Sequence, residues 1–224
     1  MRINKYIASS GICSRRKAEE YILNGDIKVN NKVIKELSYT VNLEKDIVKF
    51  KDKIIKVEDE KVYYILNKPR GYVVTLKDEK DRKCVTDLIK EDKRIFPIGR
   101  LDRDSEGLII LTNDGDFTNE VIHPSKKVEK EYEVKITGEL TEEKIKNMET
   151  GIEIDGYLTK PAKIKNVSEN TFNIVIKEGR NRQIRKMCEK VKLDVKKLKR
   201  IRIGKLRMED LKSGQYKKID KPNI

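Results

Sequence analysis

Apolar residues recur along the chain at two spacings, and together these predict an α+β fold. Beyond residue 60, short β-branched runs show the period-two alternation of strands in a mostly antiparallel or mixed sheet. Residues 141–150 and 180–191 instead favour helices, and the second of these has one apolar face. That face consists of Ile184, Met187, Cys188 and Val191, and should pack on the sheet. The predicted strands span residues 62–66, 108–112, 131–136, 171–176 and 195–203.

The first residues of the chain predict two short helices. Ile3, Tyr6 and Ile7 form one apolar face of the first helix. Ser14 is placed to cap a second helix that runs to Leu23, because a serine hydroxyl accepts a hydrogen bond from the first free backbone N–H groups. Asn24 and Gly25 then favour the end of that helix.

A hairpin follows, in which residues 27–29 and 33–34 flank the turn Asn30-Asn31. Residues 51–61 are charged and weakly periodic, which suits an edge strand or a linker. We therefore expect two domains: residues 1–60 form a small module, and residues 61–224 form the larger domain with its central sheet and flanking helices.

Positive charge is concentrated in two segments. The chain has 52 Lys and Arg against 38 Asp and Glu, a net charge of +14. Residues 1–35 carry eight basic and three acidic side chains, and residues 177–207 carry fourteen basic and three acidic. The rest of the chain is therefore nearly neutral, at −2. Two basic patches on a neutral body predict a polyanionic partner.

Composition argues against several other classes of protein. The apolar runs are too short to cross a membrane, and the N-terminus lacks the apolar core of a signal peptide, so we expect a cytoplasmic protein. Cys13, Cys84 and Cys188 are odd in number and too widely spaced for a zinc site. We interpret them as reduced, mostly structural thiols, and expect no metal site.

Charge is also concentrated on a short polar segment between two apolar ones. Asp102, Asp104 and Glu106 lie there together with Arg100 and Arg103. The run that follows is β-prone, so these residues should lie on a loop that enters a buried strand. A carboxylate held among arginines stays ionised.

Two other interpretations of this segment fail. It partly fits a calcium loop, but the twelfth position is Asn113 instead of a bidentate Glu, and positions seven to ten belong in a buried strand. Ser105 and His123 suggest a hydrolase, yet no nucleophile-elbow glycines surround the serine. His123 and Pro124 instead favour a turn.

Arg15, Arg16 and Lys17 fall in the first turn of the predicted second helix. Cations there oppose the helix dipole unless an anion binds, so this turn is a candidate phosphate site. The alternative is three solvated cations.

Several segments of the chain resemble the motifs of one enzyme family. They are Gly99-Arg-Leu-Asp102 with Asp104, Ser105 and Gly107, Arg2-Ile-Asn-Lys-Tyr-Ile7 with Gly11–Arg16, Asn67-Lys-Pro69, Lys130-Glu-Tyr132, and Glu178–Met187 followed by Val195–Arg200. Together, and in family order, they resemble the RsuA/RluB/RluE/RluF family of ribosomal RNA pseudouridine synthases, with RluF as the nearest subgroup. The segment from Gly99 is similar to the catalytic motif of that family.

The resemblance implies an S4-type RNA-binding domain, a synthase domain with its site in a central cleft, and no cofactor. It implies that Asp102 is the nucleophile, that Arg185 forms an ion pair with it, and that Tyr132 stacks on the target base. Attack on the ribose and a glycal route both stay open. Predicted RNA-binding residues are Arg2, Lys5, Arg15, Arg16, Lys17, Arg100, Arg103, Arg180, Arg182, Lys196, Lys197 and Arg200.

RluF-like relatives act on large-subunit (23S) ribosomal RNA, so we expect that substrate, free or in a ribosome assembly intermediate, and a monomeric enzyme. The alternatives are the same chemistry on small-subunit (16S) ribosomal RNA or a transfer RNA, and a non-catalytic S4-type RNA-binding protein. Asp102, Tyr132 and Arg185 in one chain favour the enzyme, because a simple binding module needs none of them.

Overall fold

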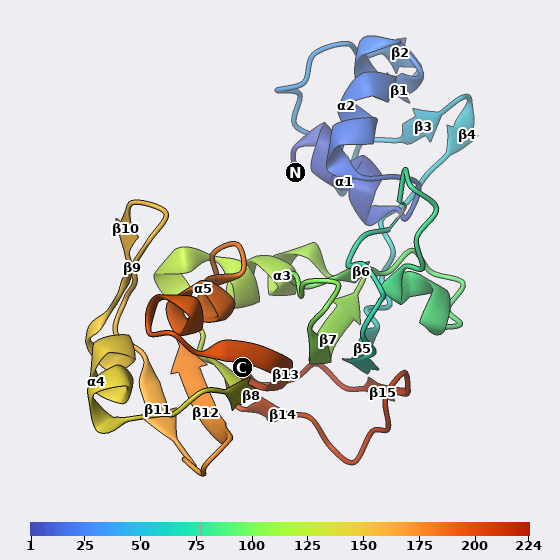
Figure 1. The fold of residues 1–224 in the computed structure, drawn as a ribbon. Coiled ribbons are helices and arrows are strands. Elements are labelled where there is room, and N and C mark those ends of the chain that lie inside the picture. Colours follow the sequence, from blue (N-terminus) through green and yellow to red (C-terminus); the bar gives the residue numbers. More distant parts are fainter. Residues whose placement is uncertain (77) are drawn as a thin grey trace. The chain divides into compact units, whose positions relative to one another are not determined.

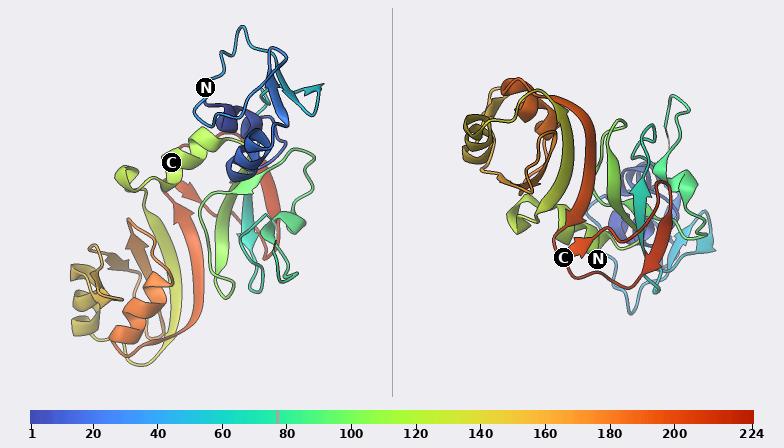
Figure 2. Two further views of the ribbon diagram at one scale, coloured as in Figure 1. Left: turned by 90° about the horizontal axis from the view of Figure 1, so that it is seen from above. Right: turned by 60° about the horizontal axis from the view of Figure 1, so that its bottom comes forward.

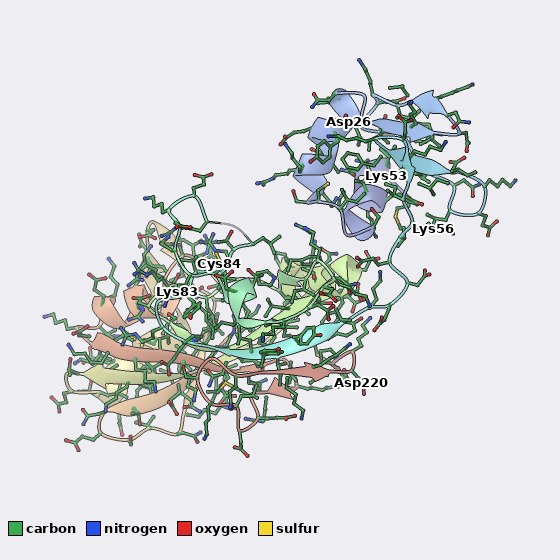
Figure 3. All side chains as sticks on the ribbon, turned by 90° about the vertical axis from the view of Figure 1, so that its right-hand side faces the viewer. Asp26, Lys53, Lys56, Lys83, Cys84 and Asp220 are labelled. Carbon is green, nitrogen blue, oxygen red and sulfur yellow. The ribbon has the colours of Figure 1, made fainter. Side chains whose placement is uncertain are left out.

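The structure is a computed structural model, and it describes residues 1–76 and 78–224. The chain divides into two compact units, which we describe separately. The first consists of residues 1–61, 91–94 and 113–115, and the second of residues 62–90, 95–112 and 116–224. Asp26 and Lys53 lie in the first unit, and Cys84 and Asp220 in the second (Figure 3).

Two helices and a four-stranded sheet make up the first unit (Figure 1). Its elements are α1 (Ile3–Ser9), α2 (Arg15–Leu23), β1 (Ile27–Val29), β2 (Lys32–Val33), β3 (Val48–Phe50) and β4 (Lys53–Ile54). The strands pair in the order β2-β1-β3-β4, so β4 is an edge strand. Ile3, Tyr6 and Ile7 are buried in the core, as their spacing predicts.

Local signals in the sequence set the ends of these elements. The Ser14 hydroxyl accepts a hydrogen bond from the backbone N–H of Lys17 at 3.2 Å, which confirms the predicted cap of α2. Asn30 and Asn31 have φ values of 49° and 68°. Two consecutive residues with positive φ are typical of the tight turn that joins β-hairpin strands, and asparagine tolerates this conformation.

A nine-stranded mixed sheet forms the centre of the second unit. Its main path is β11-β12-β8-β13-β7-β5-β15, with β14 on β13 and β6 on β7. In the described part of the chain, the pairing of β13 with β7 is the parallel one, and the other pairings in this sheet are antiparallel. The strands are β5 (Tyr63–Lys68), β6 (Phe96–Pro97), β7 (Glu106–Thr112), β8 (Lys130–Thr137), β11 (Lys163–Lys165), β12 (Thr171–Ile176), β13 (Asp194–Ile203), β14 (Leu206–Arg207) and β15 (Tyr216–Ile219).

Helices and one small hairpin accompany this sheet, and the long strands β8 and β13 lie side by side (Figure 2). The helices are α3 (Gly115–Ile122), α4 (Glu142–Thr150) and α5 (Gln183–Lys190), with the 3-10 turns η1 (Val85–Leu88) and η2 (Pro124–Lys126). The hairpin is β9 (Glu153–Ile154) with β10 (Tyr157–Leu158).

The apolar face predicted for the last helix is confirmed. Ile184, Met187, Cys188 and Val191 are all buried in the main core, where they join residues of β8, β12 and β13. The predicted start of that helix is wrong, however. Arg182 has a φ of 50°, which no α-helix accommodates, so α5 begins at Gln183 and residues 180–182 form a loop. The five strands predicted by alternation are all present.

Candidate active site

Asp102 lies on the loop between β6 and β7, at the edge of a pocket of about 530 Å³. Its side chain is half-buried. Every residue that lines this pocket belongs to the second unit, and Tyr132, Lys130 and Arg200 are among them. Of the charged lining residues, eight are basic and two are acidic, Asp102 and Glu178. The pocket is therefore a cationic site with a carboxylate at its wall.

Gly107 allows the two parallel strands to approach closely beside this loop. It pairs with Arg200 in the register of β7 and β13 and has a φ of 106°. A Cβ at this position would lie 2.3 Å from the backbone oxygen of Arg200. Only glycine fits there, for its missing side chain and for its backbone freedom. This close pairing brings the loop that bears Asp102 next to β13, the strand that bears Arg200.

Lys68, the last residue of β5, holds the loop between β6 and β7 through its side-chain amine. Its side chain is fully buried, and Nζ donates to the backbone oxygens of Ser105 at 2.7 Å and Pro69 at 3.0 Å. Burial lowers the pKa of Lys68 to about 8, although the negative charges of Asp104, Asp102 and Glu106 oppose that shift. The Asn67-Lys-Pro69 segment thus supplies an internal tether for the loop that bears Asp102.

Asp104 is the carboxylate of this loop that pairs with arginines. Arg182 Nη1 lies 3.0 Å from both of its carboxylate oxygens, and Arg185 Nε lies 3.4 Å from Oδ2. Burial raises the pKa of Asp104, but the hydrogen bond from Arg182 and the charges of Arg185 and Arg182 outweigh it, so the net shift is downward. Asp104 is therefore held ionised.

The prediction that Arg185 forms an ion pair with Asp102 is therefore wrong, because its partner is Asp104. Arg185 also donates from Nη1 to the backbone oxygen of Val195 at 3.1 Å and from Nη2 to that of Asp104 at 3.2 Å. These bonds fix the guanidinium at Asp104, two residues beyond Asp102. Within the described residues, the Asp102 carboxylate has no ion pair and lines the pocket.

Tyr132 lies on β8 directly opposite Arg200 on β13. Only 8% of its surface is exposed, and its side chain lines the pocket that Asp102 lines. The structure therefore places Tyr132 and Asp102 at one pocket. Arg185, on α5, contacts the loop that bears Asp102 through Asp104.

A second arginine-rich loop borders this pocket, at residues 178–182. The guanidinium of Arg180 lies over the ring of Tyr157, 3.1 Å from its centroid. The Tyr157 hydroxyl donates to Glu178 at 3.2 Å, and Gln183 Nε2 donates to the same carboxylate at 2.8 Å. The β9–β10 hairpin thus supports the loop that bears Arg180, a role that the sequence pattern gave no sign of.

The basic patch predicted along β13 is only partly a surface. Lys196 is exposed, and Lys197 pairs with Glu106 at 2.9 Å. Arg200 is 4% exposed, because side chains alternate along the strand and this one faces inward. Arg202 is taken up by ion pairs with Glu129 at 3.0 Å and Glu131 at 2.7 Å. Arg200 and Arg202 are therefore not part of an exposed patch.

In the first unit, the predicted RNA-binding residues lie at the surface of α1 and α2. Arg2, Arg15, Arg16 and Lys17 are exposed, and Lys5 is half-buried. The three basic residues at the start of α2 lie in its first turn, as predicted. In the second unit, Arg103 is exposed and donates from Nε to the backbone oxygen of Gly71 at 3.3 Å, while Arg100 lines the pocket.

The described residues hold no group of three or more His, Cys, Asp or Glu side chains placed to hold a metal ion. Cys13, Cys84 and Cys188 are free and buried, and Cys84 follows Lys83 just before η1 (Figure 3). Burial raises the pKa of Cys188 to about 12.

Within the described residues, no helix is long and apolar enough to cross a membrane.

Profiles of two known families match this chain. The profile of the RNA pseudouridylate synthase family matches residues 62–190. The chain belongs to that family. The S4 domain profile matches residues 1–48, so the enzyme combines an S4 domain with a pseudouridine synthase fold.

Two relatives span almost all of the enzyme. Ribosomal large subunit pseudouridine synthase B of Bacillus subtilis (strain 168) is 42% identical over 226 residues, which cover 97% of this chain and 91% of the relative. Dual-specificity RNA pseudouridine synthase RluF of Escherichia coli (strain K12) is 40% identical over 224 residues, which cover 98% of this chain and 75% of the relative. A crystal structure of a pseudouridylate synthase superposes with a TM-score of 0.72 at 28% identity, covering 98% of this chain and 96% of that one.

Proposed function

We propose that the enzyme converts one uridine of large-subunit (23S) ribosomal RNA to pseudouridine, with Asp102 as nucleophile. The observation that carries this proposal is the pocket of about 530 Å³ that both Asp102 and Tyr132 line. Its size falls within the range of about 300 to 1,000 Å³ typical of small-molecule sites. One unstacked nucleotide is a suitable occupant, because enzymes that act on a base turn it out of the stack.

In this scheme, the bond between uracil N1 and ribose C1′ breaks with assistance from the Asp102 carboxylate. The uracil turns while it stacks on Tyr132, and its C5 then bonds to C1′. C5 then loses its proton, and N1, now free of the ribose, gains one, so the reaction is an isomerisation in which nothing is added or removed overall. Arg185 acts as a positioning residue, because it holds the loop through Asp104.

We assign RNA binding to residues 1–60 and catalysis to residues 61–224. Support for RNA as partner comes from the charge: the first 35 residues carry a net charge of +5, and basic side chains dominate the pocket. The name of the Bacillus relative supports the large ribosomal subunit as substrate. A monomer in the cytoplasm, acting on free RNA or an assembly intermediate, is part of the same proposal.

The substrate is tested by incubating the purified enzyme with unmodified large-subunit ribosomal RNA and mapping pseudouridine at nucleotide resolution. Small-subunit RNA and bulk transfer RNA serve as parallel substrates. We expect one new pseudouridine in the large-subunit RNA. Modification of the small-subunit RNA or transfer RNA alone would keep the enzyme and overturn this substrate. Tight binding without product on any RNA or assembly intermediate would favour a non-catalytic binding protein.

A further inference from the structure

Arg200 lines the pocket and has one buried cationic nitrogen without a hydrogen-bond partner among the described residues. Its Nε donates to the backbone oxygen of Leu108 at 2.7 Å, and Nη1 donates to that of Arg100 at 3.3 Å. Nη2 is buried and has no hydrogen-bond partner among the described residues. The side chain is only 4% exposed and lines the pocket. A buried charged donor without a partner is costly, so it indicates a group that arrives with a ligand.

Lys130 adds a second cation on the same face of the sheet. It lies two residues before Tyr132 on β8, so both side chains point to the same side, and both line the pocket with Arg200. Burial lowers the pKa of Lys130, and the positive charge of Arg200 lowers it further. Across the part of the chain that the structure describes, neither cation forms an ion pair with a carboxylate.

The acidic side chains of the pocket do not neutralise this pair. Asp102 is the expected nucleophile, and the Glu178 carboxylate accepts hydrogen bonds from Tyr157, Gln183 and the backbone N–H of Lys160. A neutral uracil carbonyl would satisfy the free N–H of Arg200 but would leave both positive charges uncompensated. An anion satisfies both requirements, and the anionic group of RNA is its phosphate.

We propose that Arg200 and Lys130 together bind a phosphate that flanks the target uridine when this nucleotide enters the pocket. The inference rests on the proposed function, which supplies the RNA. In the sheet, Arg200 pairs with Tyr132 of β8 on one side and with Gly107 of β7, just after the Asp102 loop, on the other. A phosphate bound there therefore holds the ribose between the base-stacking residue and the nucleophile.

The test pairs protein variants with a modified RNA. A short RNA that contains the mapped uridine is made with ordinary phosphates, or with a single neutral methylphosphonate on the 5′ or the 3′ side of that uridine. The rate constant kcat/KM is measured for each RNA with the unaltered enzyme, Lys130→Gln and Lys127→Gln. Lys127 is the matched control, since it is an exposed lysine that lines the same pocket.

We expect one of the two methylphosphonates to lower kcat/KM of the unaltered enzyme about tenfold, the effect of losing one charge-assisted contact. On ordinary RNA, Lys130→Gln should lower kcat/KM by a similar factor. On that methylphosphonate RNA, the kcat/KM of Lys130→Gln should fall by less than about a further twofold, because removing both partners of one interaction costs little more than removing one. Lys127→Gln should retain the full tenfold sensitivity. Arg200→Lys, checked for its unfolding temperature, should repeat the Lys130→Gln pattern.

Two results would overturn the inference. In one, neither methylphosphonate slows the unaltered enzyme. In the other, Lys130→Gln and the methylphosphonate reduce the rate by independent factors that multiply, so the lysine acts on Asp102 or on folding instead. Failure of the proposed function is seen separately, as absence of pseudouridine from every ribosomal RNA with the unaltered enzyme.

Discussion

Arg185 is paired with Asp104, with its Nε 3.4 Å from Oδ2 and its Nη2 donating to the backbone oxygen of the same residue at 3.2 Å. The arginine therefore holds the loop between β6 and β7 at its second aspartate, through both the side chain and the backbone of Asp104. The carboxylate of Asp102 thus remains at the pocket, while Asp104 holds the loop in place through its two arginines.

Asp104→Asn should lower kcat while changing RNA affinity little. The substitution removes the charge that holds Arg182 and Arg185, so the loop loses its side-chain anchor but no expected substrate contact. We expect kcat to fall about tenfold, as for loss of about 1.4 kcal/mol of preorganisation. Single-turnover rates at saturating RNA measure this change. Asp155→Asn is the control, because Asp155 pairs with Lys186 at an exposed turn; equal effects of the two variants would contradict the assignment.

Lys68 should make the stability of the enzyme rise with pH in the alkaline range. Its pKa is about 8 in the folded protein against an ordinary 10.5, with burial as the main cause. Between these values, the unfolded chain binds a proton that the folded chain has released, so the free energy of unfolding increases with pH, by at most about 1.4 kcal/mol per pH unit. Below pH 8, the lysine is charged in both states and this gain is absent.

Urea unfolding at pH 8, 9 and 10 measures this dependence, with Lys68→Met as the reference that removes the titrating group. The difference between the two proteins should shift in favour of the unaltered enzyme as the pH increases. A difference that stays constant or shifts the other way would mean that the buried amine keeps its proton.

Gly107→Ala should destabilise the second unit strongly. The new Cβ would lie 2.3 Å and 2.7 Å from the backbone oxygen and nitrogen of Arg200, and the φ of 106° is unfavourable for alanine. Overpacking and backbone strain together predict a loss of about 3 kcal/mol or more in the free energy of unfolding. Gly179→Ala is the matched control: it meets no atom within 4 Å, and we expect a change within about 0.5 kcal/mol. Similar losses in both variants would refute the close-approach argument.

Glu131→Gln should also lower stability. This carboxylate is 2% exposed and accepts a hydrogen bond from Arg202 at 2.7 Å and from Asn173 at 3.1 Å, with Lys165 at 3.2 Å. Loss of its charge removes one of the two carboxylates that pair with the half-buried Arg202 and leaves the buried Glu131 site without its charge, at a cost of about 3 kcal/mol. Denaturant unfolding compares it with Glu133→Gln, an exposed glutamate on the same strand. If Glu131→Gln lowered the free energy of unfolding by less than Glu133→Gln does, the ion pairs of Glu131 would make no net contribution to stability.

The elements of the fold are predictable from the sequence because their signals are local. Alternation of apolar residues predicted β12 at its observed bounds, and Ser14 predicted the start of α2. The start of α5 was not predictable in this way. Its position depends on the left-handed backbone of Arg182, whose side chain is held by Asp104, 78 residues away in the sequence.

The candidate site was predictable as a set of residues but not as a set of contacts. The motifs placed Asp102 and Tyr132 in one site, and both line one pocket. Charge counting could not show that Arg200 faces inward, because its orientation depends on strand register. Lys68 and Lys130 were missed as site residues, although both lie in segments that resemble family motifs. The burial of both side chains and the backbone partners of Lys68 are visible only in the three-dimensional structure.

The role of Asp102 is tested most directly by comparing the unaltered enzyme with Asp102→Asn on large-subunit ribosomal RNA, with pseudouridine mapped at nucleotide resolution. Asn retains the shape of the side chain but not the carboxylate that we propose as nucleophile. We predict one pseudouridine with the unaltered enzyme and none with the variant, while both proteins bind the RNA with similar affinity and unfold at similar temperatures. The same pseudouridine formed by Asp102→Asn at an undiminished rate would contradict the assignment of the nucleophile.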